Sequence, residues 1–471
     1  MRTIETKLRK LSIASAMRMF ACAGFAFALS MCMLAPTASA DVRKADVIMG
    51  DTVESRGLSV VDCPDVVGEY AFVMDQDGTV YFQRNDSEEV PIASITKVMT
   101  AVVAIDSVPL DTTITVSENA ATIGESSASL MAGDTMPLSE ALLALMVPSG
   151  NDAAQAIAES VGALMLQNAG MDSSDPDACC NAFVDAMNAK AAELGLSHTV
   201  YRNPHGLDDG EFAGDQHSSA RDVAVLCAYA MKNDVFRELT NKDVATCTVN
   251  RDGAQESIEL TSTDDLLSIY EGACGVKTGY TDGAGACFAG ACNRDGKDLY
   301  SVVLNSTDEW QRFVDTQSLW DWVYENTVDY PLANSSMTTV DELSGQTVPL
   351  IAEVSDGAWI NKTVDATFAD PQASITVFSL SGNVSQSVEY RELSKNVKAG
   401  DVVGTVTFKQ HNETIATMDL IATESVAAPN VFQGIGIWWN RLLAGFNGSP
   451  KVAESVFYND STIINDKSGS S

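Results

Sequence analysis

The sequence predicts an α+β fold for residues 69–330 and a small all-β domain for residues 331–427. In the first region, short strands and amphipathic helices are mixed, with the helices in the middle, and they do not alternate regularly as in parallel α/β folds. In the second region, short segments of alternating apolar and polar residues are separated by turn residues. A chain of 471 residues is long enough for two or three domains.

The first forty residues are typical of a targeting segment. A basic start is followed by the apolar stretch MFACAGFAFALSMCMLA and by Ala38-Ser39-Ala40, which matches a cleavage site. We therefore expect a signal peptide at residues 1–40 and a mature protein outside the cytoplasm; the alternative is an uncleaved membrane anchor. Residues 41–68 are expected to form an exposed lead-in.

The elements of the first domain follow from periodicity. Residues 70–85 predict two strands around an Asp-Gly turn. Pro91 precedes a helix with apolar residues at helical spacing, and residues 138–162 predict two helices interrupted at residues 148–150. Residues 219–233 and 317–327 predict further helices, and residues 272–293 predict two strands joined around Asp282-Gly283.

The C-terminal end has two further segments. Residues 430–447 carry Trp438, Trp439 and other apolar residues at helical spacing beside Arg441, but the stretch is too short to span a bilayer. Such a helix suits the membrane–water interface, and a helix docked on its own protein is the alternative. The polar tail at residues 448–471 is expected to be disordered.

Composition excludes several classes of function. The net charge of −35 argues against a nucleic-acid partner and is typical of a soluble secreted protein. Eight of the ten cysteines follow the targeting segment, no Cys-x-x-Cys pair occurs and only four histidines are present, so we predict no metal site and no cofactor. An extracytoplasmic location permits disulfides, and buried free thiols are the alternative.

Three short motifs occur in one order along the first domain. Ser94-Ile-Thr-Lys97 comes first, Ser149-Gly150-Asn151 second and Lys277-Thr278-Gly279 third. Each motif alone is weak, but the ordered set in a secreted chain indicates an acyl-transfer site.

The residue types explain the chemistry. A serine hydroxyl needs a base to become a nucleophile, and positions i and i+3 share a helix face, so Lys97 can reach Ser94. Lys97 can act as that base only if burial and a second cation such as Lys277 lower its pKa. Ser149 can relay protons at the break between two helices, and Asn151 offers a donor and an acceptor. Lys277 and Thr278 on a strand edge can bind a substrate carboxylate, and Gly279 lets a substrate backbone approach.

The segments around these motifs resemble the low-molecular-mass penicillin-binding proteins that are serine-type D-Ala-D-Ala carboxypeptidases. VPIASITKVMTA, LMVPSGNDAAQAIAE, YRNPHGLDD and GVKTGYTDGAG carry the resemblance in the first domain, VKAGDVVGTVTF in the second, and the terminal helix resembles the family's membrane anchor. The resemblance implies a penicillin-binding, β-lactamase-like transpeptidase domain with an antiparallel sheet and a helical subdomain, attached to the outer face of the cytoplasmic membrane.

The resemblance also implies the activity. Ser94 would be acylated by the penultimate D-Ala of a peptidoglycan stem pentapeptide, with release of the terminal D-Ala, and β-lactams would be covalent inhibitors. Lys97 would be the base, Ser149 the proton relay and Asn151 a positioning group. Residues expected at the substrate are Lys277, Thr278, Gly279, Tyr280 (with Ser94, an oxyanion N–H donor) and Arg312, for which a surface arginine is the alternative.

Three other functions stay open at this point. A DD-endopeptidase belongs to the same family, and a non-catalytic penicillin sensor could use the same fold. A class A serine β-lactamase needs a deacylating glutamate, and no acid between the second and third motifs lies in a Glu-x-x-x-Asn setting. We also hypothesise that a disulfide from Cys274 to Cys287 or Cys292 staples the third motif's hairpin.

Overall fold

The computed structural model describes residues 43–447 and 450–464, so the expected signal peptide at residues 1–40 lies outside the described residues. The chain divides into two compact units, the first ending at Trp322 and the second beginning at Val323, inside helix α12 (Gln311–Glu325). We had expected the second domain to begin at residue 331. It begins earlier because strand β12 (Thr327–Pro331) pairs with a strand of the second unit and buries Tyr330.

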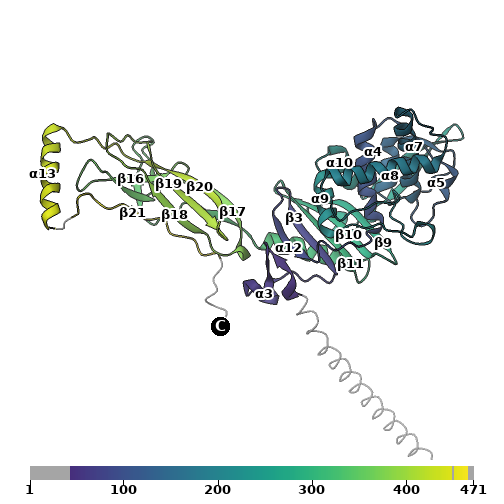
Figure 1. Cartoon of the computed structure of the whole chain (residues 1–471), viewed down its shortest axis with the longest axis horizontal. Helices are drawn as coiled ribbons and strands as arrows, with labels where there is room; N and C mark the ends of the chain where they lie inside the picture. The colour runs from purple at the N-terminus through teal and green to yellow at the C-terminus, as the bar shows by residue number, and fades with distance from the viewer. Residues whose placement is uncertain (1–42, 448–449, 465–471) are drawn as a thin grey trace, which may run out of the picture. The chain divides into compact units, whose positions relative to one another are not determined.

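A seven-stranded antiparallel sheet organises the first unit (Figure 1). Its strands, in spatial order, are β2 (Asp51–Thr52), β1 (Val47–Ile48), β4 (Val80–Arg84), β3 (Tyr70–Asp75), β11 (Lys297–Ser306), β10 (Gly285–Arg294) and β9 (Ala273–Thr281). The two expected hairpins, β3–β4 and β9–β10, are confirmed. The edge strand β9 carries the third motif.

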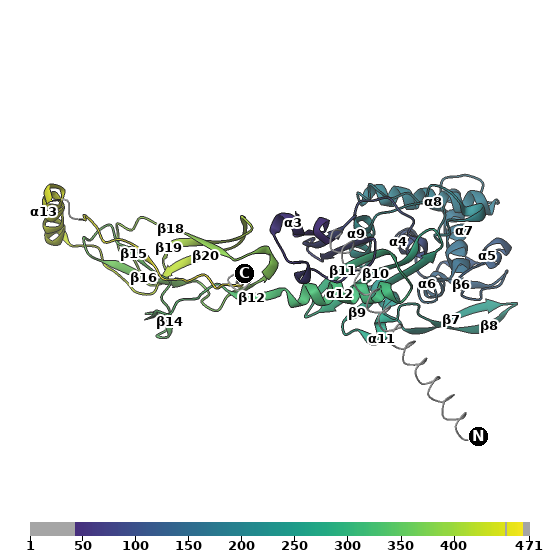
Figure 2. The ribbon, with the colours of Figure 1, turned by 90° about the horizontal axis from the view of Figure 1, so that it is seen from below.

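Helices cover both faces of this sheet because neighbouring side chains of a strand point to opposite sides. On β10, Ala289 and Ala291 belong to the core shared with the helical subdomain. Phe288 instead stacks edge-on against Phe313 of α12, with ring centroids 5.1 Å apart. Figure 2 shows α9 (Ala220–Ala230) and α12 on opposite sides of the sheet.

The helical subdomain holds the first two motifs. Its elements between the sheet strands are η2 (Ala93–Thr96), α4 (Lys97–Ser107), α5 (Glu118–Thr122), α6 (Leu138–Met146), α7 (Asn151–Asn168), α8 (Pro176–Glu193) and α10 (Asp234–Thr240). A second antiparallel sheet, β5 (Thr113–Thr115), β6 (Thr135–Pro137), β7 (Val244–Arg251) and β8 (Ala254–Thr261), adjoins it, and α11 (Leu266–Ile269) leads from β8 to β9. The expected break between α6 and α7 is confirmed, whereas α8 and the β7–β8 hairpin were not foreseen.

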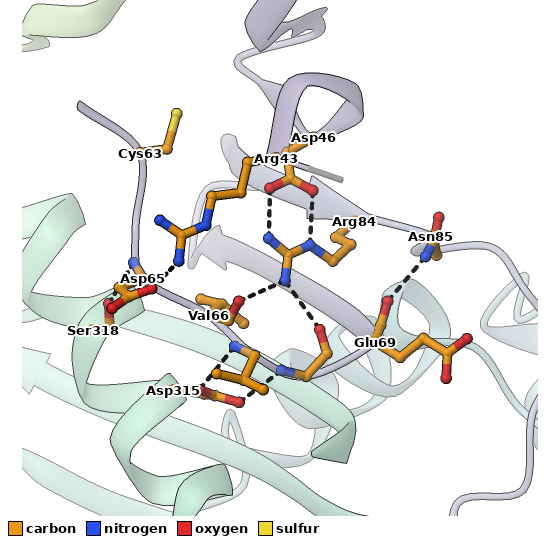
Figure 3. Close-up of polar contacts among 12 residues, drawn as sticks. Arg43, Asp46, Cys63, Asp65, Val66, Glu69, Arg84, Asn85, Asp315 and Ser318 are labelled. Carbon is orange, nitrogen blue, oxygen red and sulfur yellow. Dashed lines mark hydrogen bonds and ion pairs between the residues drawn. The ribbon is translucent and has the colours of Figure 1, made fainter. Parts of the chain in front are cut away.

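The lead-in is not exposed as expected; it forms the edge of the main sheet. Strand β1 pairs with β4, and Asp46 receives two hydrogen bonds from Arg84, Nε to Oδ1 at 2.8 Å and Nη2 to Oδ2 at 2.6 Å (Figure 3). Arg84 Nη1 also donates to the carbonyls of Val66 and Gly68, at 2.8 and 3.1 Å. Both charged side chains are buried, so the lead-in is part of the folded unit. Short elements α3 (Val53–Arg56) and η1 (Val60–Asp62) complete it.

Helix α12 fixes the other end of the lead-in. Asp315 accepts the backbone N–H groups of Val67 and Gly68 at 3.0 and 2.8 Å, and Ser318 accepts that of Asp65 at 2.9 Å (Figure 3). A buried carboxylate with N–H donors satisfies the polar backbone of a segment that has no ladder partner.

Apart from the end of α12, the short 3-10 turn η4 (Ser379–Ser381) and helix α13, the described part of the second unit is built of strands, as the sequence predicted. A six-stranded sheet has the order β18 (Ser385–Tyr390), β19 (Val402–Gln410), β20 (Glu413–Ala422), β16 (Thr363–Phe368), β15 (Ala352–Ser355) and β21 (Val456–Phe457). Two small sheets pair β12 with β17 (Ser374–Phe378) and β13 (Thr338–Val340) with β14 (Thr347–Pro349). The core includes Val354, Phe368, Val406, Phe408 and Leu420.

Helix α13 (Val431–Asn447) is confirmed as a helix, and most of the apolar side chains at residues 431–443 are exposed. Phe432 is 87% exposed, Trp438 62% and Trp439 55%. Arg441 does not extend freely from the helix: its Nη2 donates to the carbonyls of Gly357 and Trp359, both at 2.8 Å. The described part of the chain contains no helix long and apolar enough to cross a membrane.

The expectation of a disordered tail is wrong for residues 450–464. Strand β21 pairs with β15, with Phe457 opposite Ala352. Asn459 is buried, and its Nδ2 donates to Leu332 O and to Gln386 Oε1, both at 2.8 Å. The polar composition of the tail suggested disorder, but here a polar side chain makes the contact. Asn459 binds a backbone carbonyl and a side-chain amide, and both of these groups need a polar partner. The remainder of the tail lies outside the described residues.

Candidate active site

Ser94 lies in η2, one short turn of 3-10 helix, directly before helix α4 begins at Lys97. The turn places Lys97 Nζ 2.7 Å from Ser94 Oγ. Three other oxygens surround this amine: Asn151 Oδ1 at 2.6 Å, His205 O at 3.0 Å and Ser149 Oγ at 3.5 Å. The structure therefore brings the first two motifs together around one lysine.

Lys97 is fully buried, and burial lowers its pKa well below the usual range for lysine. The nearby charge of Lys277 lowers the pKa of Lys97 further, and Asp152 opposes this effect. A neutral amine has two N–H donors and one lone pair. Asn151 Oδ1 and His205 O can accept the two hydrogens, which leaves the lone pair for the Ser94 hydroxyl. The geometry is that of a nucleophile paired with its base.

The second motif occupies the break between α6 and α7. Ser149 is buried and has a φ of 66°, in the left-handed region that non-glycine residues seldom adopt. Such strain is tolerated where the surrounding contacts fix the backbone, as at functional sites. Asn151 is the first residue of α7, and its Nδ2 donates to Gly124 O at 3.1 Å, so its amide oxygen is oriented toward Lys97.

The third motif lies on edge strand β9. Lys277 is buried, its Nζ donates to Thr278 O at 3.0 Å, and its pKa is lowered to about 7 by burial and by Arg312. Thr278 Oγ1 lies 2.6 Å from Thr263 Oγ1. Tyr280, the next residue but one, is exposed.

Gly279 shows a reason for glycine that the sequence did not reveal. A Cβ atom at this position would lie 2.8 Å from Ile92 O and 3.2 Å from both Ala93 Cβ and Ser94 N. Strand β9 therefore runs directly against the turn that carries the nucleophile. The glycine admits the chain's own backbone, whereas we had assigned it to the approach of a substrate backbone.

Arg312 is buried on α12, so the alternative of a surface arginine is wrong. Its Nη1 donates to Gly279 O at 3.1 Å, and its Nη2 lies 3.3 Å from Glu309. Burial lowers the pKa of Arg312, and the arginine in turn lowers the pKa of Lys277. The side chains of Lys277, on β9, and of Arg312, which contacts β9 at Gly279 O, thus lie close together and favour an anionic ligand there.

A cleft of about 460 Å³ opens beside the nucleophile. Its lining includes Ser94, Ser126, Asn151, Asp208 and Tyr280. The lining combines polar groups of the helical subdomain with residues of β9, so the cleft can hold an extended peptide-like ligand.

Comparison with known proteins agrees with this geometry. Residues 59–308 match the family described as D-alanyl-D-alanine carboxypeptidase, peptidase S11. The chain belongs to this family. Residues 361–428 match the C-terminal domain of penicillin-binding protein 5. Both matches confirm the resemblance seen in the sequence.

Individual relatives match between about half and three quarters of the chain. D-alanyl-D-alanine carboxypeptidase DacF of Bacillus subtilis is 26% identical over 367 residues, which are 76% of this chain and 85% of the relative. DacB2 of Mycobacterium tuberculosis is 34% identical over 246 residues, which are 52% of this chain and 77% of the relative. The crystal structure of the Streptomyces K15 DD-transpeptidase has a TM-score of 0.51 at 29% identity and covers 56% of this chain and 98% of its own.

Sequence reasoning missed several groups around this peptidase site. Asp152 is buried and accepts the N–H groups of Ala128 and Leu130 at 3.0 and 3.1 Å, which holds the loop with Ser126. The carbonyl of His205 accepts a hydrogen bond from Lys97 Nζ at 3.0 Å. Every residue carries a backbone carbonyl, so the sequence could not have indicated the contact of His205. Asp152 could have been considered beforehand, because it directly follows Asn151 of the second motif.

The hypothesised disulfide is absent: all eight cysteines of the described residues are free thiols. Cys287 lies opposite Gly279, about 16 Å along β9 from Cys274 at 3.3 Å per residue. Cys292 lies nearer, opposite Ala273, but its Sγ faces Glu271 O at 3.8 Å whereas Cys274 Sγ faces Arg237 Nη1 at 3.8 Å. The thiols have different partners, and burial raises the pKa of Cys287 to about 11.

Proposed function

We propose that this chain is a serine-type D-Ala-D-Ala carboxypeptidase that removes the terminal D-alanine of peptidoglycan stem pentapeptides through an acyl-enzyme on Ser94. The observation that carries the proposal is the buried Lys97 amine, 2.7 Å from Ser94 Oγ, in a family of D-alanyl-D-alanine carboxypeptidases. A buried lysine of lowered pKa can take the serine proton near neutral pH.

Acylation requires two proton transfers. Lys97 Nζ takes the hydroxyl proton while Ser94 Oγ bonds to the carbonyl carbon of the penultimate D-Ala. The C–N bond then breaks, and the leaving amine of the terminal D-Ala receives the proton through Ser149. The 3.5 Å separation of Ser149 Oγ and Lys97 Nζ supports this relay. In the second half-reaction water takes the place of the leaving amine and releases the peptide.

The developing oxyanion needs donors beside the reacting carbon. We assign the backbone N–H groups of Ser94 and Tyr280 to this role. The close approach of Gly279 to Ser94 N supports the assignment, because it brings the two backbones within reach of one substrate oxygen. Asn151, which holds Lys97, is assigned to the substrate amide as well.

A carboxypeptidase recognises the free carboxylate at the end of its substrate. We assign Lys277 and Thr278 to that carboxylate. Arg312 supports them from behind through Gly279 O. β-Lactams carry a carboxylate in a comparable position and have a leaving group that stays tethered after ring opening, so they would remain on Ser94 as inhibitors.

The terminal helix α13 is proposed to attach the protein to the outer face of the cytoplasmic membrane. Exposed tryptophans beside other apolar side chains suit the interfacial region. Attachment predicts that the chain sediments with phospholipid vesicles and that replacing Trp438 and Trp439 by Ala abolishes sedimentation. Unchanged sedimentation of the double variant would contradict this assignment.

The activity is tested by D-alanine release from a stem pentapeptide, measured for the chain from residue 41 onward and for Ser94→Ala. We expect release by the parent and none by the variant. Release by both would exclude Ser94 as the nucleophile. Penicillin labelling without release would instead indicate a sensor, and release only with an added amine acceptor would indicate a transpeptidase.

A further inference from the structure

Thr263 lies in the short connection between β8 and α11, outside the three motifs, and its residue is exposed. Its Oγ1 is 2.6 Å from Thr278 Oγ1, the hydroxyl assigned above to the substrate carboxylate. A small hollow beside these two residues is also lined by Lys277 and Asp264. The hydroxyl of Thr263 therefore lies beside the side chains assigned above to the substrate carboxylate.

The backbone around Thr263 is held in place from both sides. Its N–H donates to Val147 O at 3.3 Å, just before the second motif, and the N–H of Ser262 donates to Asp243 O at 2.7 Å. On the other side, Leu266 N donates to Asp264 Oδ1 at 3.0 Å. The hydroxyl is thus presented by a fixed backbone and not by a free loop.

A threonine hydroxyl has one proton to donate and two lone pairs. If Thr278 donates its proton to Thr263, it has none left for the substrate. If Thr263 donates to Thr278, the Thr278 proton is free, and the acceptor-only carboxylate favours this direction. Hydrogen bonds in such a chain strengthen one another.

We propose that Thr263 is a positioning residue for recognition of the free terminal carboxylate: its hydroxyl donates to Thr278 Oγ1 and directs the Thr278 proton to the substrate. The inference rests on the proposed carboxypeptidase function. It predicts that Thr263 contributes to binding of substrates with a free carboxylate and contributes little to substrates in which that group is an amide.

The test compares Thr263→Val with Thr263→Ser on two peptides, a stem pentapeptide and the same peptide with a C-terminal carboxamide. We expect Thr263→Val to lower kcat/KM for the free acid about tenfold, mainly through KM, because one hydrogen bond to a charged group is affected. Thr263→Ser, which keeps the hydroxyl, should stay within about threefold of the parent. On the carboxamide, the parent and both variants should agree within the same range.

Controls separate this role from a structural one. Thr261→Val changes an exposed threonine at the end of β8 and should leave both substrates unaffected. An equal loss on both peptides, or a loss that serine does not restore, would overturn the proposal, as would full activity of Thr263→Val.

A second measurement distinguishes failure of this inference from failure of the proposed function. The acylation rate by benzylpenicillin, which also carries a free carboxylate, should fall about tenfold in Thr263→Val and recover in Thr263→Ser. A parent that binds penicillin but cleaves no peptide would refute the carboxypeptidase reaction while this comparison still decides the role of Thr263. Unchanged acylation by Thr263→Val would refute that role.

Discussion

The pair of Arg84 and Asp46 makes the lead-in part of the catalytic unit, and Arg84→Met tests this directly. The substitution keeps an unbranched side chain but removes four hydrogen bonds, two to Asp46 and two to the carbonyls of Val66 and Gly68. Asp46 is only 1% exposed, so its carboxylate would be left buried without its cation.

Removing one partner of a buried ion pair costs about 3–5 kcal/mol of folding free energy. At roughly 2–4 °C per kcal/mol for a domain of this order of size, the midpoint of unfolding should fall by about 6–20 °C. Burial already raises the pKa of Asp46. Without Arg84 the folded-state pKa rises further, so the destabilisation should grow as pH increases from 5 to 7, where the unfolded carboxyl is ionised.

Calorimetry of the whole chain measures this effect, and the transition that shifts on penicillin acylation identifies the first unit. Arg43→Met is the matched control, because Arg43 pairs with Asp65, whose side chain is 79% exposed. An exposed pair contributes at most about 1 kcal/mol. If Arg84→Met lowered the transition no more than Arg43→Met does, the buried pair would not hold the lead-in, and the reasoning would be refuted.

Three further predictions concern the site. Lys277→Gln removes a charge that lowers the pKa of Lys97, so the pKa of Lys97 should rise. The acid side of the pH profile of the penicillin-acylation rate should then move to higher pH; an unchanged profile would show that the two amines are not coupled. Asp264→Asn removes a carboxylate that raises the pKa of Lys277, which is about 7 with that carboxylate present, so the pKa of Lys277 should fall and KM for the stem peptide should rise more at pH 8 than at pH 6; an equal rise at both pH values would contradict this coupling. Gly279→Ala should slow acylation at least about tenfold, because its Cβ would push β9 from the nucleophile turn; Gly434→Ala in α13, where nothing lies within 4 Å of the added Cβ atom, serves as the control, and wild-type acylation by Gly279→Ala would contradict the contact.

Much of the site could be predicted because its chemistry depends on residue type. The serine, its lysine and Lys277 are recognisable in order along the chain, and the periodicity around them correctly predicted helix α4, the α6–α7 break and the β9–β10 hairpin, although Ser94 lies in the 3-10 turn before α4 and not in the helix itself. The structure confirms that the first two motifs meet at Lys97. Their catalytic roles remain proposals that the experiments above test.

Other contacts could not be predicted, for physical reasons that differ. The carbonyl of His205 contacts Lys97 through a group that every residue carries. Asp46 and Arg84 are common surface residue types, and nothing local indicates that they meet in the core. Strand β21 has two residues, too few to show an alternation, and its docking depends on the buried amide of Asn459.

The measurement that tests the central claim most directly is the location of the acyl group. The chain is acylated with benzylpenicillin, digested, and mapped by mass spectrometry, beside Ser94→Ala and Lys97→Met. Our account predicts one adduct per chain on Ser94, none in Ser94→Ala, and acylation slowed by about 10²–10⁴-fold in Lys97→Met because the base is lost. An adduct on another residue, or acylation of Lys97→Met at the parent's rate, would contradict the assignment of nucleophile and base.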